Sequence, residues 1–466
     1  MGIWAARRVR NSQDFLVAGR RLPFLWATSL LFSTWFGSES ILGASETFAR
    51  GGLLAVIEDP FGSALCLFLV GIWLARPFYR LPVRTFGDFY ALHFGRLTER
   101  VATVLMIISY FGWIAAQLVA LGQVLRHFLG GTLPLMTALA TALILSYTTW
   151  GGMWSVAAVD LMQNVFIIAG LIVLIGFLPE GWTAGLSQLP TGFLDFWPKP
   201  EPHAWLEYLA AWMVIGLGSL PQQDMYQRVV SARSEKVARQ AGIAAAFLYV
   251  SVGLLPLTAG LFIRMHHPEW LRTEGEATAP ILRLVEGYMP PGVQFLFWGA
   301  LIAAIMSSAS GGILAPAALL SENLLARWHR LRTLWKARLA VIVVAFFCYL
   351  MTLYEQNIYK LVGESSIFSL VTLFWPMVVG LHAPRWRSAT GAIVSMIGGI
   401  VAYYLAQAVE VAIPPLWYGF GASLLGYIAG TVGEKTFTFW RDAFGWHSRS
   451  RTGATAPRAA DRDLPA

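Results

Sequence analysis

The sequence has few charged residues and almost no cysteine. Charged side chains make up 13% of the 466 residues, whereas soluble domains carry about 25%. The two cysteines, Cys66 and Cys348, both lie in apolar stretches, so a disulfide framework is excluded. With 56% apolar residues and a mean hydropathy of +0.58, the chain has too little polar surface to fold in water. The composition excludes the soluble classes and indicates a membrane protein, and the apolar runs described below indicate that it is an all-α polytopic one.

Motifs for ATP hydrolysis and nucleophilic catalysis are also missing. The sequence contains no G-x-x-x-x-G-K-[ST] phosphate loop and no G-x-S-x-G element. Its eight histidines are scattered, whereas a zinc site needs three or four converging ligands. These absences argue against an enzyme. Transport is the favoured class, with membrane sensing as the alternative.

Apolar runs of about 20 residues, the length that crosses the hydrocarbon core, occur twelve times along the chain. Two longer polar segments, 180–204 and 265–291, separate spans 5 and 6 and spans 7 and 8. The predicted spans are 23–43, 52–75, 101–128, 132–148, 154–178, 205–221, 236–264, 292–320, 337–354, 358–380, 388–408 and 413–433.

The basic residues indicate the orientation of these spans. If the segment before span 1 is cytoplasmic and the sides then alternate, 27 of the 34 Lys and Arg residues lie inside. The positive-inside rule predicts this bias, so we expect both termini to be cytoplasmic. The net charge of +8 is thus explained by topology, and no nucleic-acid partner is needed to account for it.

Spans 1 and 6 contain residues that interrupt helices. Irregular backbone at membrane depth is tolerated only where it is buried in protein or lines a cavity. Interruptions at matching positions of two halves point to a transporter binding site, and spans 1 and 6 are the first helices of two groups of five. The predicted breaks are at Gly37 in span 1 and at Gly216, Gly218 and Pro221 in span 6.

Span 8 carries a cluster of small and hydroxyl residues. Positions i, i+3 and i+4 share one face of a helix, so the Ala304 carbonyl and the Ser307 and Ser308 hydroxyls can point at one place. A hard cation such as Na⁺ takes several oxygen ligands, and unwound carbonyls near Gly37 are natural additional donors. The alternative is that these serines donate back to carbonyls of their own helix.

Acidic residues inside membrane spans are costly and usually functional. Glu39 and Glu364 lie deepest, and each could bind substrate, take up a proton or pair with a buried donor. Asp160 lies near the inner surface, where it either serves an ion or is solvated. Glu58 and Asp59 lie close enough to the outside to line a wet vestibule.

Several motifs together resemble those of the sodium:solute symporters, which have a LeuT-like inverted-repeat fold. The resemblance covers nearly the whole chain. The motifs are Asp14 to Arg20 before span 1, Tyr147 to Asp160 and Gln163, Pro221 to Arg228 after span 6, the Ala304/Ser307/Ser308 pattern, and Pro376, Gly380 and Arg387 at the end of span 10.

The resemblance implies a Na⁺ site between spans 1 and 8 and a neighbouring solute site. The sodium ligands it implies are the carbonyls of Ser33, Phe36 and Ala304 and the hydroxyls of Ser307 and Ser308, with Asp160 on the inward exit path of the ion. The substrate-lining residues it implies are Glu39, Ser40, Trp212 and Gln222, to which the deep acid Glu364 is added.

The resemblance also implies a domain organisation. Two inverted repeats of five helices, 23–178 and 205–380, lie between a cytoplasmic segment 1–22 and two C-terminal helices, 388–433. We expect residues 434–466 to form a disordered cytoplasmic tail. Members of the family usually begin with an additional helix, and MGIWAARRV resembles the last turns of that helix. We therefore expect either that the native start lies further upstream or that this member has lost the helix.

The expected function is therefore Na⁺-coupled import of a small organic solute across the plasma (inner) membrane by alternating access. A proton-coupled carrier that uses Glu39 or Glu364 is one alternative. A sensor with this fold and a separate output partner is another. Besides the lipid bilayer and the solute, no partner is predicted, and the sequence does not indicate an oligomeric state.

Overall fold

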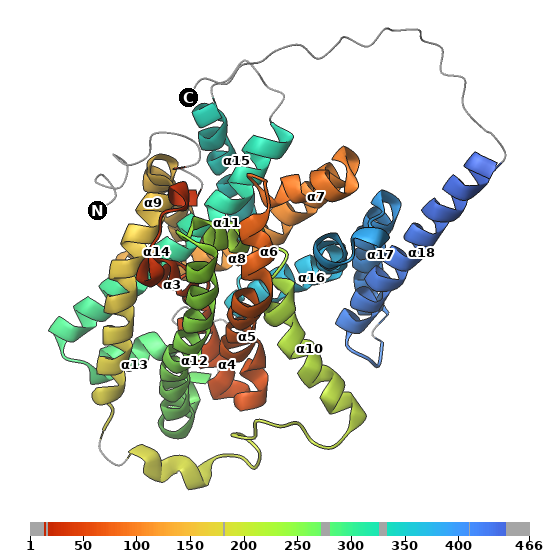
Figure 1. Ribbon diagram of the computed structural model, residues 1–466. Coiled ribbons are helices and arrows are strands. Elements are labelled where there is room, and N and C mark those ends of the chain that lie inside the picture. The colour runs from red at the N-terminus through yellow and green to blue at the C-terminus, as the bar shows by residue number, and fades with distance from the viewer. Residues whose placement is uncertain are drawn as a thin grey trace.

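The computed structural model describes residues 14, 17–179, 182–271, 280–325, 333–409 and 411–443. These residues are almost entirely helical and contain no β-strand, apart from an isolated parallel bridge between Leu22 and Ala232. The helices pack into one bundle, and α17 (Ala389–Ala408) and α18 (Pro415–Ala443) lie side by side at one edge of it (Figure 1). The all-α polytopic fold predicted from the apolar runs is confirmed.

Several of the remaining helices, α12 (Glu235–His266) and α16 (Ile358–His382) among them, follow predicted spans closely. Eight helical stretches within the described residues are long and apolar enough to cross a membrane, so the predicted total of twelve stays a prediction. The remaining long helices are α8 (Arg96–Leu129), α9 (Leu133–Gly176), α10 (Pro202–Gly218), α12 (Glu235–His266), α14 (Pro291–Leu319), α15 (Thr333–Tyr354) and α16 (Ile358–His382). The shorter ones are α3 (Phe24–Phe32), α4 (Ala44–Gly51), α5 (Ser63–Leu69), α6 (Ala75–Arg80), α7 (Phe86–Phe94), α11 (Gln223–Ser231) and α13 (Pro280–Tyr288).

Side chains that satisfy free backbone N–H groups start several of these helices. Ser234, Asn357 and Ser388 accept hydrogen bonds from the third residue of α12, α16 and α17, respectively. Thr85 and Asp88 form a reciprocal capping box at the start of α7. The polar residues between the apolar runs therefore set where these helices begin.

Two predictions about helix ends are wrong. The predicted spans 132–148 and 154–178 form one helix, α9, because the two glycines between them cost only about 1 kcal/mol each in a helix and no proline follows them. Residues 434–443, expected in a disordered tail, continue α18, where Glu434 accepts hydrogen bonds from the Ser388 hydroxyl and the Thr390 N–H. The segments MGIWAARRV and 444–466 lie outside the described residues.

Span 1 is interrupted in its middle. Helix α3 ends at Phe32, and a π-helical turn, Glu39–Gly43, leads into α4. The Thr34 hydroxyl donates to the Leu30 carbonyl at 2.9 Å, which competes with regular helix hydrogen bonding, and the Ser33 hydroxyl oxygen lies 3.3 Å from the same carbonyl. Gly37 lies in the interruption, where a Cβ atom would be only 2.8 Å from Ser308 Oγ.

Span 6 is interrupted between α10 and α11. The interruption follows Gly218, where a Cβ would lie 2.3 Å from the Ser366 carbonyl oxygen, and it includes Pro221, which has no N–H to donate. Gly216 lies just before, in the last turns of α10. After α11 the chain pairs with the segment before α3, because the N–H of Leu22 donates to Ser231 at 3.0 Å. The two interrupted spans are thus joined at one end.

Candidate functional site

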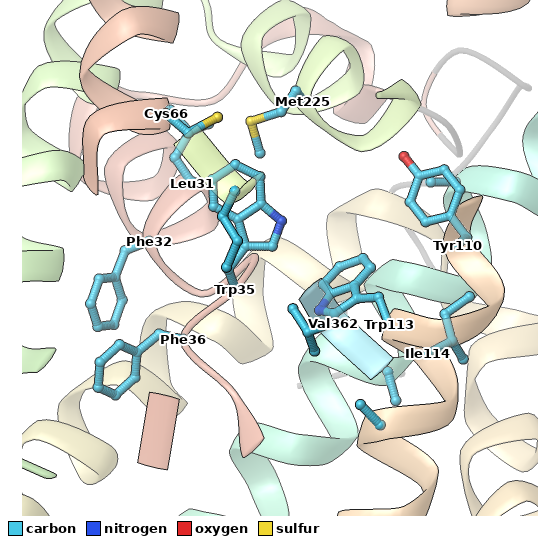
Figure 2. Close-up of a cluster of buried hydrophobic side chains, with 14 of the residues drawn as sticks. Leu31, Phe32, Trp35, Phe36, Cys66, Tyr110, Trp113, Ile114, Met225 and Val362 are labelled. Carbon is cyan, nitrogen blue, oxygen red and sulfur yellow. The ribbon is translucent and has the colours of Figure 1, made fainter. Parts of the chain in front are cut away.

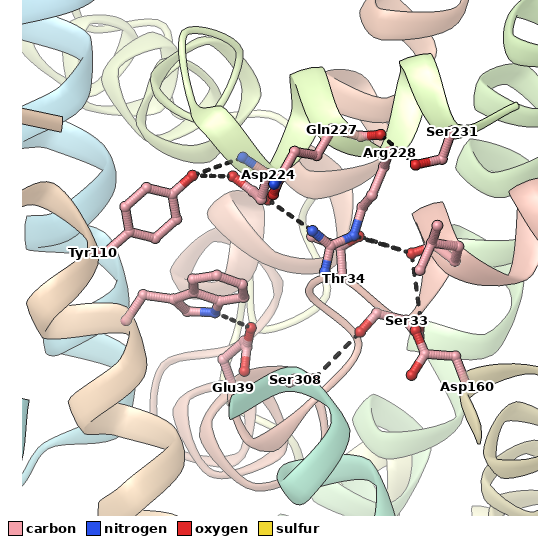
Figure 3. A network of polar contacts seen from close by, with 12 residues as sticks. Ser33, Thr34, Glu39, Tyr110, Asp160, Asp224, Gln227, Arg228, Ser231 and Ser308 are labelled. Atoms are coloured by element: carbon pink, nitrogen blue, oxygen red, sulfur yellow. Dashed lines mark hydrogen bonds and ion pairs between the residues drawn. The ribbon is translucent and has the colours of Figure 1, made fainter. Parts of the chain in front are cut away.

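The interruption of span 1 contacts α9 and α14 through a group of oxygen atoms. Ser308 Oγ on α14 donates to the Ser33 carbonyl at 3.3 Å, and Ser33 Oγ donates to Asp160 of α9 at 2.6 Å (Figure 3). Ser307 Oγ donates to the other oxygen of the same carboxylate. Four residues from α9, α14 and the interrupted segment of span 1 therefore place a carbonyl, hydroxyls and a carboxylate around one buried position.

This set of oxygens fits a hard monovalent cation, which takes neutral oxygens and a carboxylate without requiring nitrogen or sulfur. Phe36 and Ala304, the other two predicted ligands, are buried in the same two segments, at 1% and 2% exposure. Their coordination of Na⁺ stays a prediction. Within the described residues, no group of three or more His, Cys, Asp or Glu side chains converges as a multivalent metal site would require.

Asp160 is more deeply buried than a solvated group would be. Its exposure is 1%, and its two carboxylate oxygens accept hydrogen bonds from the hydroxyls of Ser33 and Ser307. Of the two possibilities left open by the sequence, solvation is wrong. Asp160 contacts the proposed ion ligands directly, so its carboxylate can balance the charge of a cation at this position.

A buried ion pair stands next to this group. Arg228 of α11 lies 3.8 Å from Asp224, and its Nε donates to the Leu30 carbonyl at 3.3 Å (Figure 3). Tyr110 of α8 donates to the same aspartate. Because Arg228 bridges α11 and the end of α3, it connects the two interrupted spans to each other.

Glu39 lies at the other side of the interruption and is 2% exposed. Trp113 Nε1 donates to it at 3.0 Å and Gln117 Nε2 at 2.5 Å, both from α8. Among the described residues, no Lys, Arg or His forms an ion pair with this carboxylate. A buried carboxylate with only neutral donors can accommodate a cationic group.

Aromatic and apolar side chains surround the same region (Figure 2). Trp35 comes from the interrupted segment, Tyr110 and Trp113 come from α8, and Met225 and Val362 lie nearby in the same view. Trp35 and Trp113 are only 5% and 4% exposed. Indole and phenol rings attract cations to their faces, and Trp113 of this cluster also contacts Glu39, so the cluster offers groups that can bind an organic cation.

The other predicted substrate residues are not all at this place. Ser40 is buried in the π-helical turn, and Gln222 is buried at the start of α11. Trp212 packs against Phe196 in an aromatic cluster. Glu364 is 41% exposed and lies 4.0 Å from Lys360, so the structure does not group it with Glu39.

Sequence reasoning missed several buried polar residues. Gln117, a lone amide in an apolar span, and Tyr249 on α12 both contact the interrupted segment. Asp59, expected in a wet vestibule, is 1% exposed and hydrogen-bonded inside the protein, so that expectation is wrong. An isolated Gln inside an apolar span was the available signal for Gln117, but nothing in the sequence distinguishes Tyr249 from other apolar-face tyrosines.

Comparison with known proteins identifies the family. The model described as "Sodium:solute symporter family" matches residues 15–399. High-affinity choline transporter 1 of Drosophila melanogaster is 28% identical over 419 residues, covering 85% of this chain and 67% of that protein. The human protein of the same name is 26% identical, covering 86% and 73%. A sodium/glucose cotransporter of Vibrio parahaemolyticus is 25% identical, covering 66% and 63%.

Solved structures show the same fold. A Na⁺-coupled sialic acid symporter in a substrate-bound outward-open state aligns with a TM-score of 0.75 at 21% identity, over 94% of both chains. Mhp1, a nucleobase-cation-symport-1 family transporter, aligns with a TM-score of 0.60 at 15% identity. The fold is therefore that of the LeuT-like transporters. The chain belongs to the sodium:solute symporter family, and it is a multi-pass membrane transporter and not an enzyme.

Proposed function

We propose that this transporter imports a small organic cation of the choline type, driven by the inward movement of Na⁺. The observation that carries the proposal is Glu39, a buried carboxylate at the interruption of span 1 that is held by two neutral donors, the indole of Trp113 and the amide of Gln117. The choline transporters among its relatives support the same class of solute.

A cation is favoured because a buried carboxylate without a positive partner is expensive. Trp113 and Gln117 offset part of the desolvation cost of Glu39, but neither carries a charge. A solute with an ammonium group would supply the charge. Quaternary ammonium groups have no hydrogen to donate and are recognised through aromatic faces, which Trp35, Tyr110 and Trp113 provide in this region.

Sodium coupling is assigned to the group of Ser33, Asp160, Ser307 and Ser308. An ion there draws the interrupted segment of span 1 toward α9 and α14, and Gly37 places that segment within reach of both Ser308 and Gln117. Gln117 in turn donates to Glu39. Occupancy of the ion site is thereby linked to the position of the carboxylate that receives the solute.

Alternating access requires the cytoplasmic end of the bundle to open after Na⁺ and the solute have bound from outside. In this structure the segments beside spans 1 and 6 are joined there by Leu22, whose carbonyl accepts from the Arg233 N–H at 2.9 Å. The Arg20 guanidinium also donates to the Tyr79 carbonyl at 2.5 Å. The positive-inside bias assigns this end to the cytoplasm, so these contacts form the proposed inner gate.

The energetics permit strong accumulation. One Na⁺ moving through 100 mV contributes about 2.3 kcal/mol, and a tenfold Na⁺ gradient contributes about 1.4 kcal/mol. A monovalent cationic solute adds a further 2.3 kcal/mol or so because it moves through the same potential. The total, about 6 kcal/mol, supports roughly 10⁴-fold accumulation of the solute.

The test is uptake by the full chain in liposomes with an imposed Na⁺ gradient, with labelled choline and glucose as probes. We expect choline uptake with Na⁺ but not with K⁺ outside, and little glucose uptake. Glu39→Gln should weaken choline uptake, because the carboxylate is lost while its neutral donors stay. Glu46→Gln is the matched control, since Glu46 lies on α4 of the same span and pairs with Arg50 at the surface.

The outcomes separate this function from its alternatives. Uptake that follows a pH gradient and ignores Na⁺ would show a proton-coupled carrier. Ligand binding without any transport would indicate a sensor. Equal choline uptake by Glu39→Gln and Glu46→Gln would remove Glu39 from the solute site. The proposal places the protein in the plasma (inner) membrane with both termini cytoplasmic, and it assigns 23–178 and 205–380 as the two repeats.

A further inference from the structure

We propose that Arg228 is a tethered counter-cation: its guanidinium pairs with Asp224 while Na⁺ is bound, and it moves to Asp160 when Na⁺ leaves. The inference rests on the proposed function, because it concerns how the empty transporter returns after Na⁺ and the solute have been released. In this account Arg228 is a positioning residue, since it acts through the carboxylate of Asp160.

The guanidinium of Arg228 lies next to the helix faces that form the proposed Na⁺ site. Gly311 follows Ser308 by three residues on α14, so these two positions share a face of that helix. On α9, Val156 precedes Asp160 by four residues and shares a face with it. A Cβ at Gly311 would lie 2.8 Å from Arg228 Nη2 and 3.9 Å from Val156 Cγ1. The arginine is therefore about one helical turn away from the oxygens of the site.

Polar contacts also connect Arg228 to Asp160. Arg228 Nε donates to the Leu30 carbonyl at 3.3 Å, and the Ser33 hydroxyl oxygen lies 3.3 Å from the same carbonyl. Ser33 Oγ in turn donates to Asp160 at 2.6 Å (Figure 3). The charges of Arg228 and Asp160 are close enough to attract each other. The arginine and the carboxylate thus belong to one connected polar group.

The pairing of Arg228 with Asp224 is loose. Arg228 Nη1 lies 3.8 Å from Asp224 Oδ2, which is longer than a hydrogen bond. Both of these atoms are buried, and neither has a hydrogen-bond partner. A buried ion pair that only stabilises a fold needs good geometry and satisfied hydrogen bonds to offset its desolvation. A pair with two unsatisfied atoms is instead suited to exchanging partners.

The charges of this group balance only when a further cation is present. Asp160 and Asp224 are 1% and 0% exposed, and Arg228 supplies one positive charge for the two carboxylates. Within the described residues, no other Lys, Arg or His forms an ion pair with either aspartate. Na⁺ at the proposed site supplies the second positive charge. When Na⁺ leaves, one buried carboxylate loses its partner, which is strongly unfavourable.

Asp224 tolerates the loss of the arginine better than Asp160 tolerates the loss of Na⁺. Asp224 lies in the first turn of α11, where free N–H groups and the helix dipole favour a negative charge, and Tyr110 donates to it. Asp160 lies in the middle of α9, where its donors are the hydroxyls of Ser33 and Ser307. After Na⁺ has left, the guanidinium is therefore needed more at Asp160.

A guanidinium at Asp160 and a Na⁺ ion in the site exclude each other. Na⁺ that binds from outside displaces Arg228 toward Asp224, and Arg228 returns to Asp160 as Na⁺ leaves toward the cytoplasm. The empty transporter then returns without an unpaired carboxylate at the ion site. The arginine should thus weaken Na⁺ binding and speed the return step.

The first test measures Na⁺ binding without any solute, by thermal unfolding of the full chain in detergent with K⁺ replacing Na⁺. The double variant Asp224→Asn with Arg228→Gln removes both charges of the pair, so neither is left unpaired. The Na⁺ concentration needed for a given gain in melting temperature should fall about tenfold or more, the worth of one charge-assisted hydrogen bond. Arg387→Gln is the matched control, since that guanidinium also donates to a backbone carbonyl, that of Gly380, and it should leave the Na⁺ response unchanged.

The second test compares net uptake with exchange in liposomes. Net choline uptake along a Na⁺ gradient requires the empty transporter to return, whereas exchange of labelled for unlabelled choline at equal Na⁺ does not. The double variant should keep exchange and lose net uptake by about tenfold or more. A variant that only damages the fold lowers both fluxes together.

Gly311→Ala tests the same idea if the double variant does not fold. Its Cβ would lie 2.8 Å from Arg228 Nη2, so the guanidinium must leave the face of α14 while every charge is kept. It should change the Na⁺ response and the ratio of net uptake to exchange in the same directions as the double variant. Gly299→Ala on the same helix, where a Cβ has no heavy atom within 4 Å, should change neither.

Three results would overturn the proposal. An unchanged Na⁺ response in the double variant would show that Arg228 does not compete with Na⁺. Equal losses of exchange and net uptake would show that the arginine stabilises the fold or the gates and not the empty state. A missing Na⁺ response in the unmodified protein would remove the Na⁺ site itself, and the proposed sodium coupling with it. A normal Na⁺ response without choline exchange would instead contradict only the choline-type solute, because the first test of Arg228 needs no solute.

Discussion

Replacing Ser308 by alanine is the sharpest test of the proposed Na⁺ site between span 1 and α14. Ser308 is 2% exposed, and its hydroxyl reaches from α14 to the Ser33 carbonyl of the interrupted segment. In the proposed Na⁺ site, that hydroxyl is one of the neutral ligands of the ion. The substitution removes a single oxygen and adds no bulk, so the fold should be kept.

The magnitude follows from the worth of one polar contact to a charged group, about 1.5–3 kcal/mol. Each 1.4 kcal/mol is a tenfold change in affinity, so the Na⁺ dissociation constant should rise about 10- to 150-fold. Na⁺ at 100 times its dissociation constant stabilises the folded protein by about 2.7 kcal/mol. The variant should therefore need about 10- to 150-fold more Na⁺ than the unmodified protein for the same gain in melting temperature.

The assay is thermal unfolding in detergent across a Na⁺ series, with K⁺ replacing Na⁺ at constant ionic strength. Ser321→Ala is the control, because its hydroxyl is also buried and donates to a carbonyl further along the same helical stretch. Ser321→Ala should titrate like the unmodified protein. Identical Na⁺ midpoints for Ser308→Ala and Ser321→Ala would refute the assignment of Ser308 as a ligand.

Two further predictions concern other positions. Gly37→Ala should lower both Na⁺ affinity and choline uptake, because its Cβ would lie 2.8 Å from Ser308 Oγ and from Gln117 Oε1. The control is Gly299→Ala on α14, which should change neither, because a Cβ there would have no heavy atom within 4 Å. Equal activity of the two variants would contradict the close approach at Gly37. The pKa of His93 is lowered from 6.5 to about 4, mainly because the imidazole is partly buried and also because the Arg387 guanidinium repels its charged form. Because the unfolded chain then binds a proton that the folded protein does not, the melting temperature should fall as the pH decreases from 6.5 toward 4. His93→Gln should reduce that decrease, and an unchanged pH profile would contradict the pKa shift.

The spans could be predicted because the bilayer imposes their length and hydropathy. The predicted span 236–264 differs from α12 by one residue at its start and two at its end, and 358–380 differs from α16 by two residues at its end. The loop predicted between 148 and 154 was wrong because glycine marks helix ends only weakly when no proline or capping residue accompanies it. The breaks in spans 1 and 6 were visible because Gly and Pro are unusual at membrane depth beside polar residues.

The site was only partly predictable, since helical periodicity describes one helix and not its neighbours. Ser307 and Ser308 share a face that the i, i+3 and i+4 pattern from Ala304 makes visible. Their contact with Asp160 depends on how α9 packs against α14. The burial of Asp59 depends on Tyr249, which is 190 positions away in the chain. Glu364 is the converse case: its span is buried as a whole, but its own side chain points to a half-exposed position beside Lys360.

The central claim is that solute and sodium move together, and reverse coupling measures it most directly. Liposomes containing the full chain are given equal Na⁺ on both sides, labelled with ²²Na⁺ outside, and an inward gradient of choline at zero membrane potential. The account predicts that choline drives ²²Na⁺ into the vesicles, and that Ser308→Ala abolishes this flux at the same Na⁺ concentration. Choline entry accompanied by acidification without ²²Na⁺ uptake, or no flux of either species, would contradict it.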